Sequence, residues 1–356
     1  MLKKSLPLII GIIIGILIVW IYEFFNSQKQ IHSKQLWNEK LNLVQQTEMI
    51  ESKKNNALLS EMNSVVNQMN VELNHDSKGI LSDATIGRLA ALSYSFTPYY
   101  HVEGDSISHR KICPERGLLL LEIACMKMDS GSFKKMMGQC IFSYAYLKKA
   151  DLKNANLEGI NLQYATLREA NLEGANLNHS NLRDADLWGV NLKQATLNNS
   201  DLTLADLSWG DMNGANFVKA NLTKALVKSA QMKKCDLSNA IMVRADFTGT
   251  FLNESTLRKS NMLSTILVRV NLSGANLTEA ILTTAPLTEA ILNDANFERA
   301  TLSKCGLTNT VVGSADWLTQ LTQWKVTGAE GILNQYQLVS DTVEHKPHFY
   351  LSNRVK

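Results

Sequence analysis

Small, polar and apolar residues follow one another in a fixed five-residue word between Cys140 and Trp317, without insertion or deletion. Counting from Phe142, every fifth residue is the centre of a word. Leu occupies 25 of the 36 centres, and Phe, Met, Val and one Trp occupy the others. Two residues before the centre, Ala holds 22 of 36 positions. The residue directly before the centre favours Asn or Asp, and the two residues after it vary freely. One structural unit is therefore repeated through half of the chain.

A period of five is incompatible with one long helix or one long strand. In an α-helix, successive centres would rotate by about 140° and share no common face. In a long strand, an odd period would send alternate centres to opposite faces. The spacing of two between the Ala and Leu positions does fit a short strand, whose residues i and i+2 point the same way. We therefore predict a β-solenoid in which each word is a short extended piece followed by a corner.

The words AYLKK, ADLKN, ANLEG and ATLRE, between Ala145 and Glu169, resemble the A(D/N)Lxx pattern of pentapeptide-repeat proteins. This resemblance implies a right-handed quadrilateral β-helix with four words per coil and about nine coils. At about 4.8 Å per coil, the rod would be roughly 43 Å long. Residues 93–100 and 114–120 resemble a segment found upstream of the repeats in membrane-anchored bacterial members. That second resemblance implies a bacterial protein and brings no activity with it.

A charge-free apolar segment from Leu6 to Tyr22 predicts a transmembrane anchor within residues 1–25. A cleaved signal peptide is the alternative, but no small-residue cleavage site follows the apolar segment. Two lysines before the segment favour a single-pass protein of the bacterial cytoplasmic membrane with its body outside the cytoplasm, and lysines after it weaken this bias. Gly11 and Gly15 form a GxxxG spacing, which suits a helix-dimer contact and hence a homodimer. The alternative is that Gly is simply frequent in membrane helices.

Helical segments flank the repeats. We expect one helix to begin after Ser82 and a buried helix to begin at Pro114, a residue that suits a first helical turn. After the repeats, Ser314 is a candidate N-cap for an amphipathic helix. Both flanks are expected to cap the solenoid, because an uncovered coil exposes unpaired N–H and C=O groups. The predicted segments are a transmembrane anchor (1–25), a helical stalk or linker (26–80), an α-rich cap (81–138), the pentapeptide-repeat β-helix (139–317), and a helical cap with a tail (318–356).

The sequence carries no motif of an ordinary active site. G-x-S-x-G, H-E-x-x-H, P-loop and G-x-G-x-x-G patterns are all missing from it. We therefore expect no enzymatic activity, no cofactor and no small-molecule substrate. His101, His109, Cys113 and Cys125 form the one group that suggests a metal, but their spacing matches no zinc pattern. Cys113 and Cys125 could also form a disulfide outside the cytoplasm, and the sequence leaves this open.

Two features depart from the repeat. Thr250, Ser255, Ser260 and Thr265 take four successive Ala positions. Their inward hydroxyls need hydrogen-bond partners, so we expect ordered water or a wider coil there, unless this position simply tolerates change. Pro286 occupies an Asn/Asp position and lacks an N–H group. It is tolerable there if the missing donor would face a corner rather than the ladder between coils.

Outward aromatic residues supply the one binding hypothesis. With four words per coil, Tyr144 and Tyr164 stack on each other. Trp188 and Trp209 belong to equivalent words on successive coils. Because Trp and Tyr are favoured anchors of interfaces, these four residues are a candidate protein-binding patch. The alternative is that isolated outward aromatics have no function.

The charge of the repeats bears on the best-known role of the family. Some pentapeptide-repeat proteins resemble duplex DNA in charge and shape and protect topoisomerases from inhibitors. Such mimicry needs an acidic surface, yet residues 140–317 carry 17 Lys and Arg and 17 Asp and Glu. Nor does a net charge of +3 favour nucleic-acid binding. We predict a non-enzymatic, membrane-tethered rigid scaffold or protein-interaction module, with a DNA-mimicking topoisomerase-protecting protein as the alternative.

Overall fold

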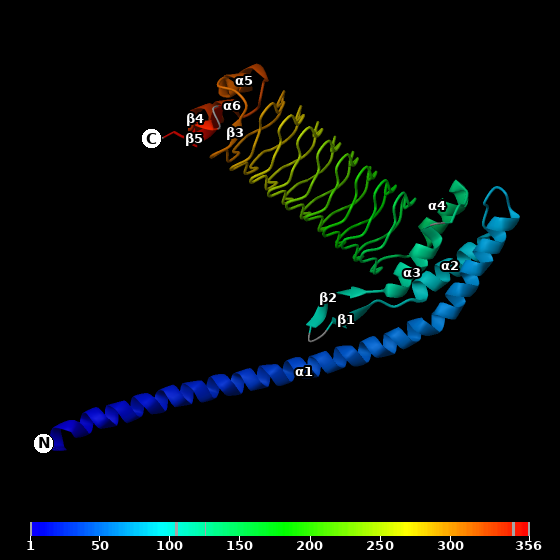
Figure 1. The fold of residues 1–356 in the computed structure, drawn as a ribbon, viewed down its shortest axis with the longest axis horizontal. Helices are drawn as coiled ribbons and strands as arrows, with labels where there is room; N and C mark the ends of the chain where they lie inside the picture. Colours follow the sequence, from blue (N-terminus) through cyan, green and yellow to red (C-terminus); the bar gives the residue numbers. More distant parts are fainter. Residues whose placement is uncertain (1, 104–105, 125, 344–345, 355–356) are drawn as a thin grey trace. The chain divides into compact units, whose positions relative to one another are not determined.

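The structure is a computed structural model of residues 1–356. It describes residues 34–102, 106–108, 110–124, 126–342 and 349–354 in full, and gives only the helix or strand assignment for residues 2–33, 103, 109, 343 and 346–348. The chain forms two compact units, one of Met1–Lys54 with Tyr99–Lys111 and one of Asn55–Pro98 with Ile112–Lys356. Figure 1 labels their helices and strands.

The first unit combines the N-terminal part of α1 (Leu2–His75) with a hairpin of β1 (Tyr99–Glu103) and β2 (Ser106–Ile112). Glu48 joins the helix to the hairpin. Its carboxylate accepts a hydrogen bond from the Val102 N–H at 3.0 Å and lies 2.6 Å from Nδ1 of His101. The sequence pattern does not predict this hairpin, which lies within the segment where only helices were expected.

The predicted membrane anchor lies outside the fully described part of α1. Leu6 to Tyr22, with Gly11 and Gly15, fall in the stretch for which only helix is assigned. Among the residues described in full, no helix is long and apolar enough to cross a membrane. The anchor and the helix-dimer contact therefore stay predictions from the sequence.

The second unit begins with the end of α1 and three shorter helices, α2 (Asp83–Ser95), α3 (Pro114–Ala124) and α4 (Ser130–Gln139). α2 and α3 start where the sequence predicts. Ser82 is the N-cap of α2, and its Oγ accepts a hydrogen bond from the Thr85 N–H at 3.2 Å. α4 is not predicted by the sequence pattern. It begins behind Asp129, whose carboxylate accepts a hydrogen bond from the Gly131 N–H at 2.8 Å.

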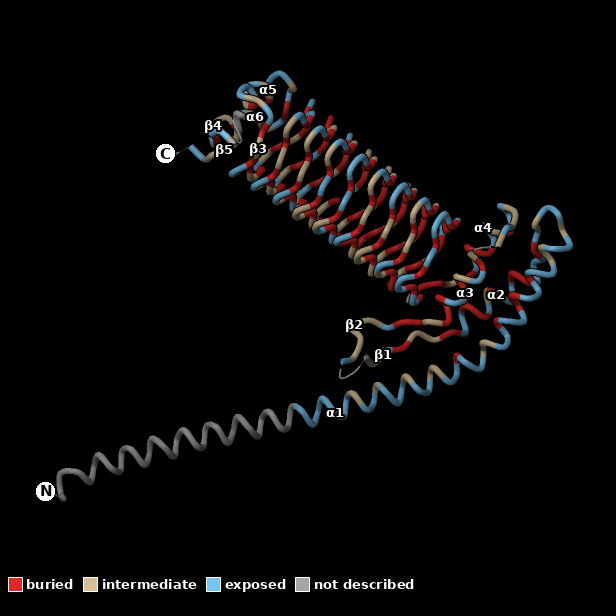
Figure 2. Tube along the Cα trace, viewed as in Figure 1, coloured by how far each residue is buried: buried red, intermediate tan, exposed pale blue. Residues whose placement is uncertain are grey.

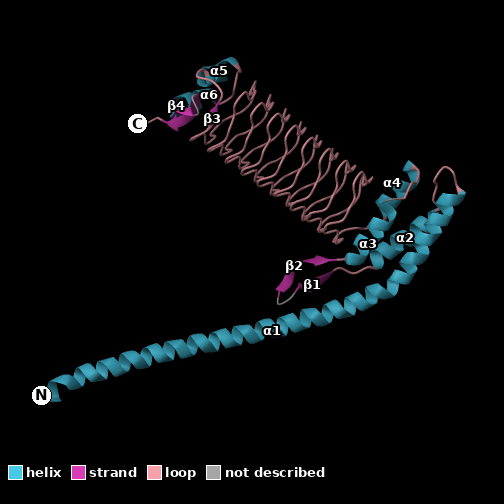
Figure 3. Ribbon diagram, in the orientation of Figure 1, coloured by secondary structure: helices cyan, strands magenta, loops and turns pink. Residues whose placement is uncertain are grey.

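The solenoid follows the period of five, and Figure 3 shows its coils as stacked loops rather than long strands. Residues twenty apart pair in parallel, as Asp151 does with Asn171, so four words complete one coil. Each word turns through a hydrogen bond to the carbonyl of its centre, such as the 3.0 Å bond from Ala150 N to Leu147 O. Between these two residues, Lys149 has a φ of 60°. A left-handed residue at this place is what a type II turn requires.

The Leu and Ala columns fill the interior, and Figure 2 shows buried residues in red at regular intervals along the coils. Every centre from Leu157 to Leu307 is at most 1% exposed. Burying one such Leu side chain contributes about 1.5–3 kcal/mol. The predicted β-solenoid is therefore confirmed, and its core is continuous from coil to coil.

Backbone carbonyls, rather than a wider coil, satisfy most of the inward hydroxyl groups. Thr250 Oγ1 donates to Val227 O at 2.5 Å, and Ser255 Oγ donates to Met232 O at 2.7 Å. Thr265 and, earlier in the small-residue column, Ser180 are exceptions, because their buried hydroxyl oxygens have no hydrogen-bond partner within the described part of the chain. The hydroxyl position is thus tolerated because the neighbouring coil offers an acceptor.

The condition for tolerating Pro286, a missing donor that faces a corner, is not met. At the equivalent position of neighbouring words, Ile281 N donates to Ser260 O at 3.0 Å, and Ile291 N donates to Val270 O at 2.9 Å. The N–H at this position therefore belongs to the ladder between coils and does not face a corner. Pro286 removes the ladder bond that would reach the carbonyl of Thr265.

The regular words stop at Thr310, and a small C-terminal layer follows. Its elements are β3 (Val311–Val312), α5 (Trp317–Gln323), α6 (Ala329–Gln335), β4 (Tyr336–Val343) and β5 (Lys346–Asn353). The three strands form an antiparallel sheet of order β3-β5-β4.

Three expectations for this layer are corrected. Trp317, counted as the last centre, begins α5 instead. Asp316, not Ser314, is the N-cap, and it makes no side-chain cap bond. The predicted tail is a hairpin, because β5 finds a partner in β3 at the end of the solenoid.

Candidate protein-binding surface of the solenoid

The first coil is covered by the chain that precedes it. Cys113 continues the parallel ladder: its N–H donates to Tyr144 O at 2.7 Å, and its carbonyl accepts from Tyr146 N at 3.2 Å. α3 then lies directly on the backbone of the coil. A Cβ atom at Gly117 would stand 2.3 Å from Tyr146 O, so only glycine fits at that point. On this side, the exposed edge of the first coil is thereby paired and shielded.

A buried arginine fastens this cap. Arg116 is 5% exposed, and its guanidinium donates to three backbone carbonyls. Nε reaches Ser93 O at 3.1 Å, Nη2 reaches Phe96 O at 2.9 Å, and Nη1 reaches Ser143 O at 2.8 Å. Burial lowers the pKa of Arg116, yet an arginine side chain stays protonated in proteins. One cation thus ties the end of α2 to the first word of the solenoid.

The cysteine beside this arginine is structural. Burial raises the pKa of the Cys113 thiol to about 12, and Sγ lies 3.5 Å from the buried carboxylate of Glu115. Asn55 of α1 donates to the same carboxylate at 3.1 Å. Cys113 is a free thiol, whereas Cys125, its candidate disulfide partner, lies outside the described residues. A thiol of such high pKa is a poor nucleophile.

No metal-binding cluster occurs where side chains are described. There, no group of three or more His, Cys, Asp or Glu side chains is arranged to hold an ion. His101 lies beside Glu48 in the first unit. The side chains of His109 and Cys125 fall outside the described residues.

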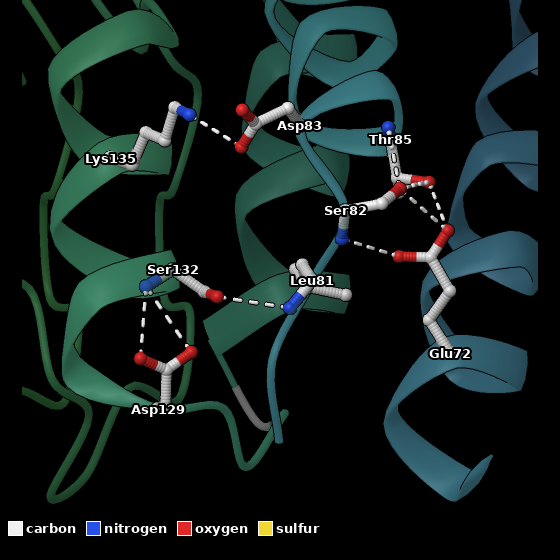
Figure 4. Close-up of polar contacts among 8 residues, drawn as sticks. All are labelled: Glu72, Leu81, Ser82, Asp83, Thr85, Asp129, Ser132 and Lys135. Atoms are coloured by element: carbon white, nitrogen blue, oxygen red, sulfur yellow. Dashed lines mark hydrogen bonds and ion pairs between the residues drawn. The ribbon is translucent and has the colours of Figure 1, made fainter. Parts of the chain in front are cut away.

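A carboxylate of α1 holds the start of α2, as Figure 4 shows. Glu72 accepts hydrogen bonds from Ser82 N at 2.7 Å, Ser82 Oγ at 2.9 Å and Thr85 Oγ1 at 2.5 Å. Burial would raise the pKa of Glu72, but the hydrogen bonds from Thr85, Gln68 and Ser82 outweigh it and lower the pKa to about 2. On the other side of α2, Lys135 of α4 pairs with Asp83. These contacts hold the helices of the cap together.

The last coil is covered by the C-terminal layer. Thr327 accepts a hydrogen bond from Leu302 N and donates one to Ala300 O, each at 2.9 Å. On another face, Asn309 N donates to Leu351 O of β5 at 2.8 Å. The chain itself therefore covers part of each end of the stack, and the lateral faces are left for contacts with other molecules.

The structure brings together part of the predicted aromatic patch. The rings of Tyr144 and Tyr164 stack with their centroids 4.9 Å apart. Trp188 lies under a guanidinium, with Arg168 Cζ 4.6 Å from the ring centroid. This cation–π contact holds the Trp188 ring against the preceding coil.

Trp209 is the exposed member of the patch, at 64%. The turns that carry Trp188 and Trp209 are hydrogen-bonded neighbours, because Gly189 N donates to Ser208 O at 2.9 Å. Their placement on successive coils agrees with the predicted register. Binding of a partner at the patch stays a prediction.

A second surface feature is missed by the sequence reasoning. Six aliphatic side chains of the solenoid, each 36–43% exposed, lie on or beside one corner of successive coils. We call them the apolar edge: Leu204, Leu226, Ile241, Leu263, Ile266 and Ile281. The signal was available in the sequence, because apolar residues here take word positions that elsewhere hold Asn, Asp or other polar residues.

Ion pairs between adjacent coils neutralise much of the remaining surface. Lys153 and Glu173 lie 2.9 Å apart, and Arg269 and Glu289 lie 2.6 Å apart, each pair joining residues twenty apart. Exposed pairs of this kind contribute at most about 1 kcal/mol each. Their effect is to balance charge along the stack.

The family model for pentapeptide repeats matches the chain in eight copies, within residues 140–178 and 180–312. The chain is a pentapeptide-repeat protein. This confirms the resemblance predicted from the words themselves, while the membrane-anchored bacterial type stays a prediction. No curated protein matches this pentapeptide-repeat protein.

Solved structures of other pentapeptide-repeat proteins are similar to the solenoid. HetL, involved in heterocyst differentiation regulation in the cyanobacterium Nostoc sp. strain PCC 7120, is 27% identical with a TM-score of 0.30, over 53% of this chain and 98% of HetL. Rfr23 from the cyanobacterium Cyanothece 51142 is 27% identical with a TM-score of 0.27, over 36% of this chain and 86% of Rfr23. QnrB1, a plasmid-mediated fluoroquinolone resistance protein, is 14% identical with a TM-score of 0.28, over 50% of this chain and 93% of that one. TM-scores this low add nothing to the family match.

Proposed function

We propose that this pentapeptide-repeat protein is a non-enzymatic, membrane-tethered scaffold whose solenoid offers its lateral surface to protein partners. The observation that carries the proposal is that the chain itself pairs with both ends of the stack, at Cys113 and at Thr327. Where the edge of a terminal coil is paired in this way, it cannot add another chain by backbone pairing. What it can offer is a rigid array of side chains on its faces, including the aromatic patch of Tyr144, Tyr164, Trp188 and Trp209.

The finer points of the proposal rest on the sequence. The apolar segment from Leu6 to Tyr22 supports a single-pass anchor in a bacterial cytoplasmic membrane, and the lysines before it support a body outside the cytoplasm. The GxxxG spacing of Gly11 and Gly15 supports a homodimer through the anchor. Pairing at intervals of twenty residues supports a quadrilateral solenoid of about nine coils, and the family resemblance supports its right-handed sense.

Topology and fractionation test the tether. The full chain should stay in the membrane pellet after an alkaline wash, and a variant lacking residues 1–25 should be released. A periplasm-dependent alkaline phosphatase fused after Lys356 should be active. If a reporter that works only in the cytoplasm is active when fused at the same place, the proposed orientation is wrong.

The scaffold role is tested by cross-linking in intact cells. A chain carrying Trp209→Ala and Tyr164→Ala should lose a cross-linked species that the unchanged protein forms. Lys259→Ala, at an exposed turn, serves as the control and should keep this species. If both variants keep the cross-linked species, no partner binds at the patch.

A DNA-mimicking, topoisomerase-protecting protein is the alternative function. The equal numbers of acidic and basic residues in the repeats argue against it, since duplex DNA is uniformly negative. A supercoiling assay with DNA gyrase and a fluoroquinolone separates the two functions. Protection of the gyrase by the full chain would favour the alternative, and we expect none.

A further inference from the structure

The apolar edge runs along one corner of the solenoid. Leu226 and Ile266 belong to one column of parallel bridges, with Asp246 between them. Ile241 and Ile281 belong to the column on the adjacent face, with Asn261 between them. Leu204 and Leu263 lie in the turns that join these two faces. The six side chains therefore form a stripe along this corner, with polar residues between some of them.

The fold does not need apolar residues at these places. The outward position before each centre is served by Asn and Asp, which form ladders between coils, as Asn171 Nδ2 does when it donates to Asp151 Oδ1 at 2.9 Å. Asn221 and Asn261 take that position in the same column as Ile241 and Ile281. An isoleucine there gives up the ladder and exposes apolar surface. Contiguous exposed apolar side chains of this kind mark interaction sites.

Two cations interrupt the stripe. Lys224 and Arg244 lie in the turns of the apolar edge, between Leu204 and Leu263 along the stack. Neither forms an ion pair within the described residues, whereas Asp246 is paired with Lys228 at 3.0 Å. The edge thus offers apolar side chains and two cations that have no ion-pair partner among the described residues.

These charges indicate the kind of partner. A second copy of the chain would bring the same cations toward one another, and like charges across an interface are costly. A segment that carries carboxylates beside apolar residues would instead be attracted. Because the solenoid backbone is already paired between coils, such a segment must be recognised by its side chains and not as an added strand.

The length of the edge sets the length of the partner segment. From Leu204 to Ile281 the edge spans five successive coils. Four steps of about 4.8 Å make it about 19 Å long. A helix of about 13 residues has this length.

We propose that the apolar edge binds an amphipathic helix of a partner protein, about 13 residues long, with apolar side chains on one face and Asp or Glu beside them. The proposal rests on the scaffold function proposed above and names its contact surface.

Two synthetic 14-residue helical peptides provide the probe. Both carry Leu at positions i, i+3, i+4 and i+7, flanked in one peptide by Glu and in the other by Lys. The full chain in mild detergent should bind the Glu peptide in a fluorescence anisotropy titration, with an affinity at least tenfold higher than for the Lys peptide. Lys224→Glu with Arg244→Glu should reverse this preference.

Asparagine substitutions test the apolar part. Ile241→Asn with Ile281→Asn places asparagine throughout the column that holds Asn221 and Asn261, so the solenoid should stay folded by circular dichroism while affinity for the Glu peptide falls at least tenfold. Phe251→Asn is the matched control, because Phe251 takes the same word position with 43% exposure on a different face. Its affinity for the Glu peptide should be unchanged.

Several outcomes would overturn the proposal. One is equal binding of the Glu peptide by the double asparagine variant and the unchanged chain. Another is self-association in sedimentation that the double variant abolishes, since this would assign the edge to a second copy. If the cross-linked species of the intact cell survives in the double variant and the Glu peptide fails to bind, the edge proposal fails and the scaffold function stands. If the species never forms while the Glu peptide binds, the scaffold function fails instead.

Discussion

Gly117 is the residue at which the N-terminal cap can be detached with the smallest change. Replacing it with alanine adds one methyl group, which would stand 2.3 Å from Tyr146 O and 3.1 Å from the Tyr146 carbonyl carbon. Both are backbone atoms of the first coil and cannot rotate away. α3 must therefore shift outward, and the two hydrogen bonds of Cys113 to that coil must lengthen.

The cost of this substitution can be worked out from three contributions. Overpacking against a rigid neighbour costs about 1–3 kcal/mol. The two weakened hydrogen bonds cost up to about 1 kcal/mol each. Alanine offsets about 1 kcal/mol, because it is a better helix former than glycine. We expect Gly117→Ala to lower the free energy of unfolding by about 2 kcal/mol, the middle of the range that these contributions give.

Gly87 supplies the control, since it also lies inside a helix and a Cβ there would meet nothing within 4 Å. Gly87→Ala should raise the free energy of unfolding by about 1 kcal/mol. Urea unfolding followed by tryptophan fluorescence measures both changes. Hydrogen exchange should show faster exchange at the Tyr146 amide in Gly117→Ala alone. If the two substitutions stabilise the chain equally, α3 does not pack on the first coil as described.

Three further predictions concern the core and the cap. Thr250→Ala should cost about 1–3 kcal/mol more than Thr265→Ala in urea unfolding, because only Thr250 gives up a buried hydrogen bond; equal costs would contradict the assigned hydroxyl partners. Ala195→Phe should overpack the small-residue column by about 1–3 kcal/mol, whereas Lys193→Phe, in an exposed turn, should cost under about 1 kcal/mol; equal costs would refute the register. The lowered pKa of Glu72 stabilises the cap above the ordinary glutamate range, and this contribution should disappear as the pH falls from about 4.5 to about 2. Glu72→Gln should remove that part of the pH dependence of the free energy of unfolding. If the variant and the unchanged chain show the same pH dependence, protonation of Glu72 is not linked to unfolding of the cap.

The solenoid could be predicted in detail because its period is strict. The words place Ala150 and Leu152 inward and Lys149 in a turn without any tertiary information, and the structure agrees. The caps were harder, because their helices are held by long-range contacts. α4 contains two glycines and few apolar residues, so its helix depends on the cap at Asp129 and on packing against α2.

The surface was predicted only in part for a similar physical reason. Tyr144 and Tyr164 were paired correctly, because a repeat of twenty residues follows from the four-sided coil. The binding hypothesis from the sequence rests on outward aromatic residues, however, so it does not include the aliphatic residues of the apolar edge. Finding Leu226 and Ile241 on one corner requires the words to be sorted by face. The condition for tolerating Pro286 could not be tested on the sequence, because the direction of each N–H cannot be read from a one-dimensional pattern.

The four-word coil also restricts how this solenoid can change its length during evolution. Loss of twenty residues removes one coil and leaves every column of the surface aligned. Loss of a single word keeps the Leu and Ala columns filled, because every word has the same interior residues. It would nevertheless rotate everything beyond the deletion by a quarter turn. A deletion of five residues near Asp184 would therefore carry the apolar edge to another face than Tyr144 and Tyr164, so binding surfaces could be rearranged around an unchanged core.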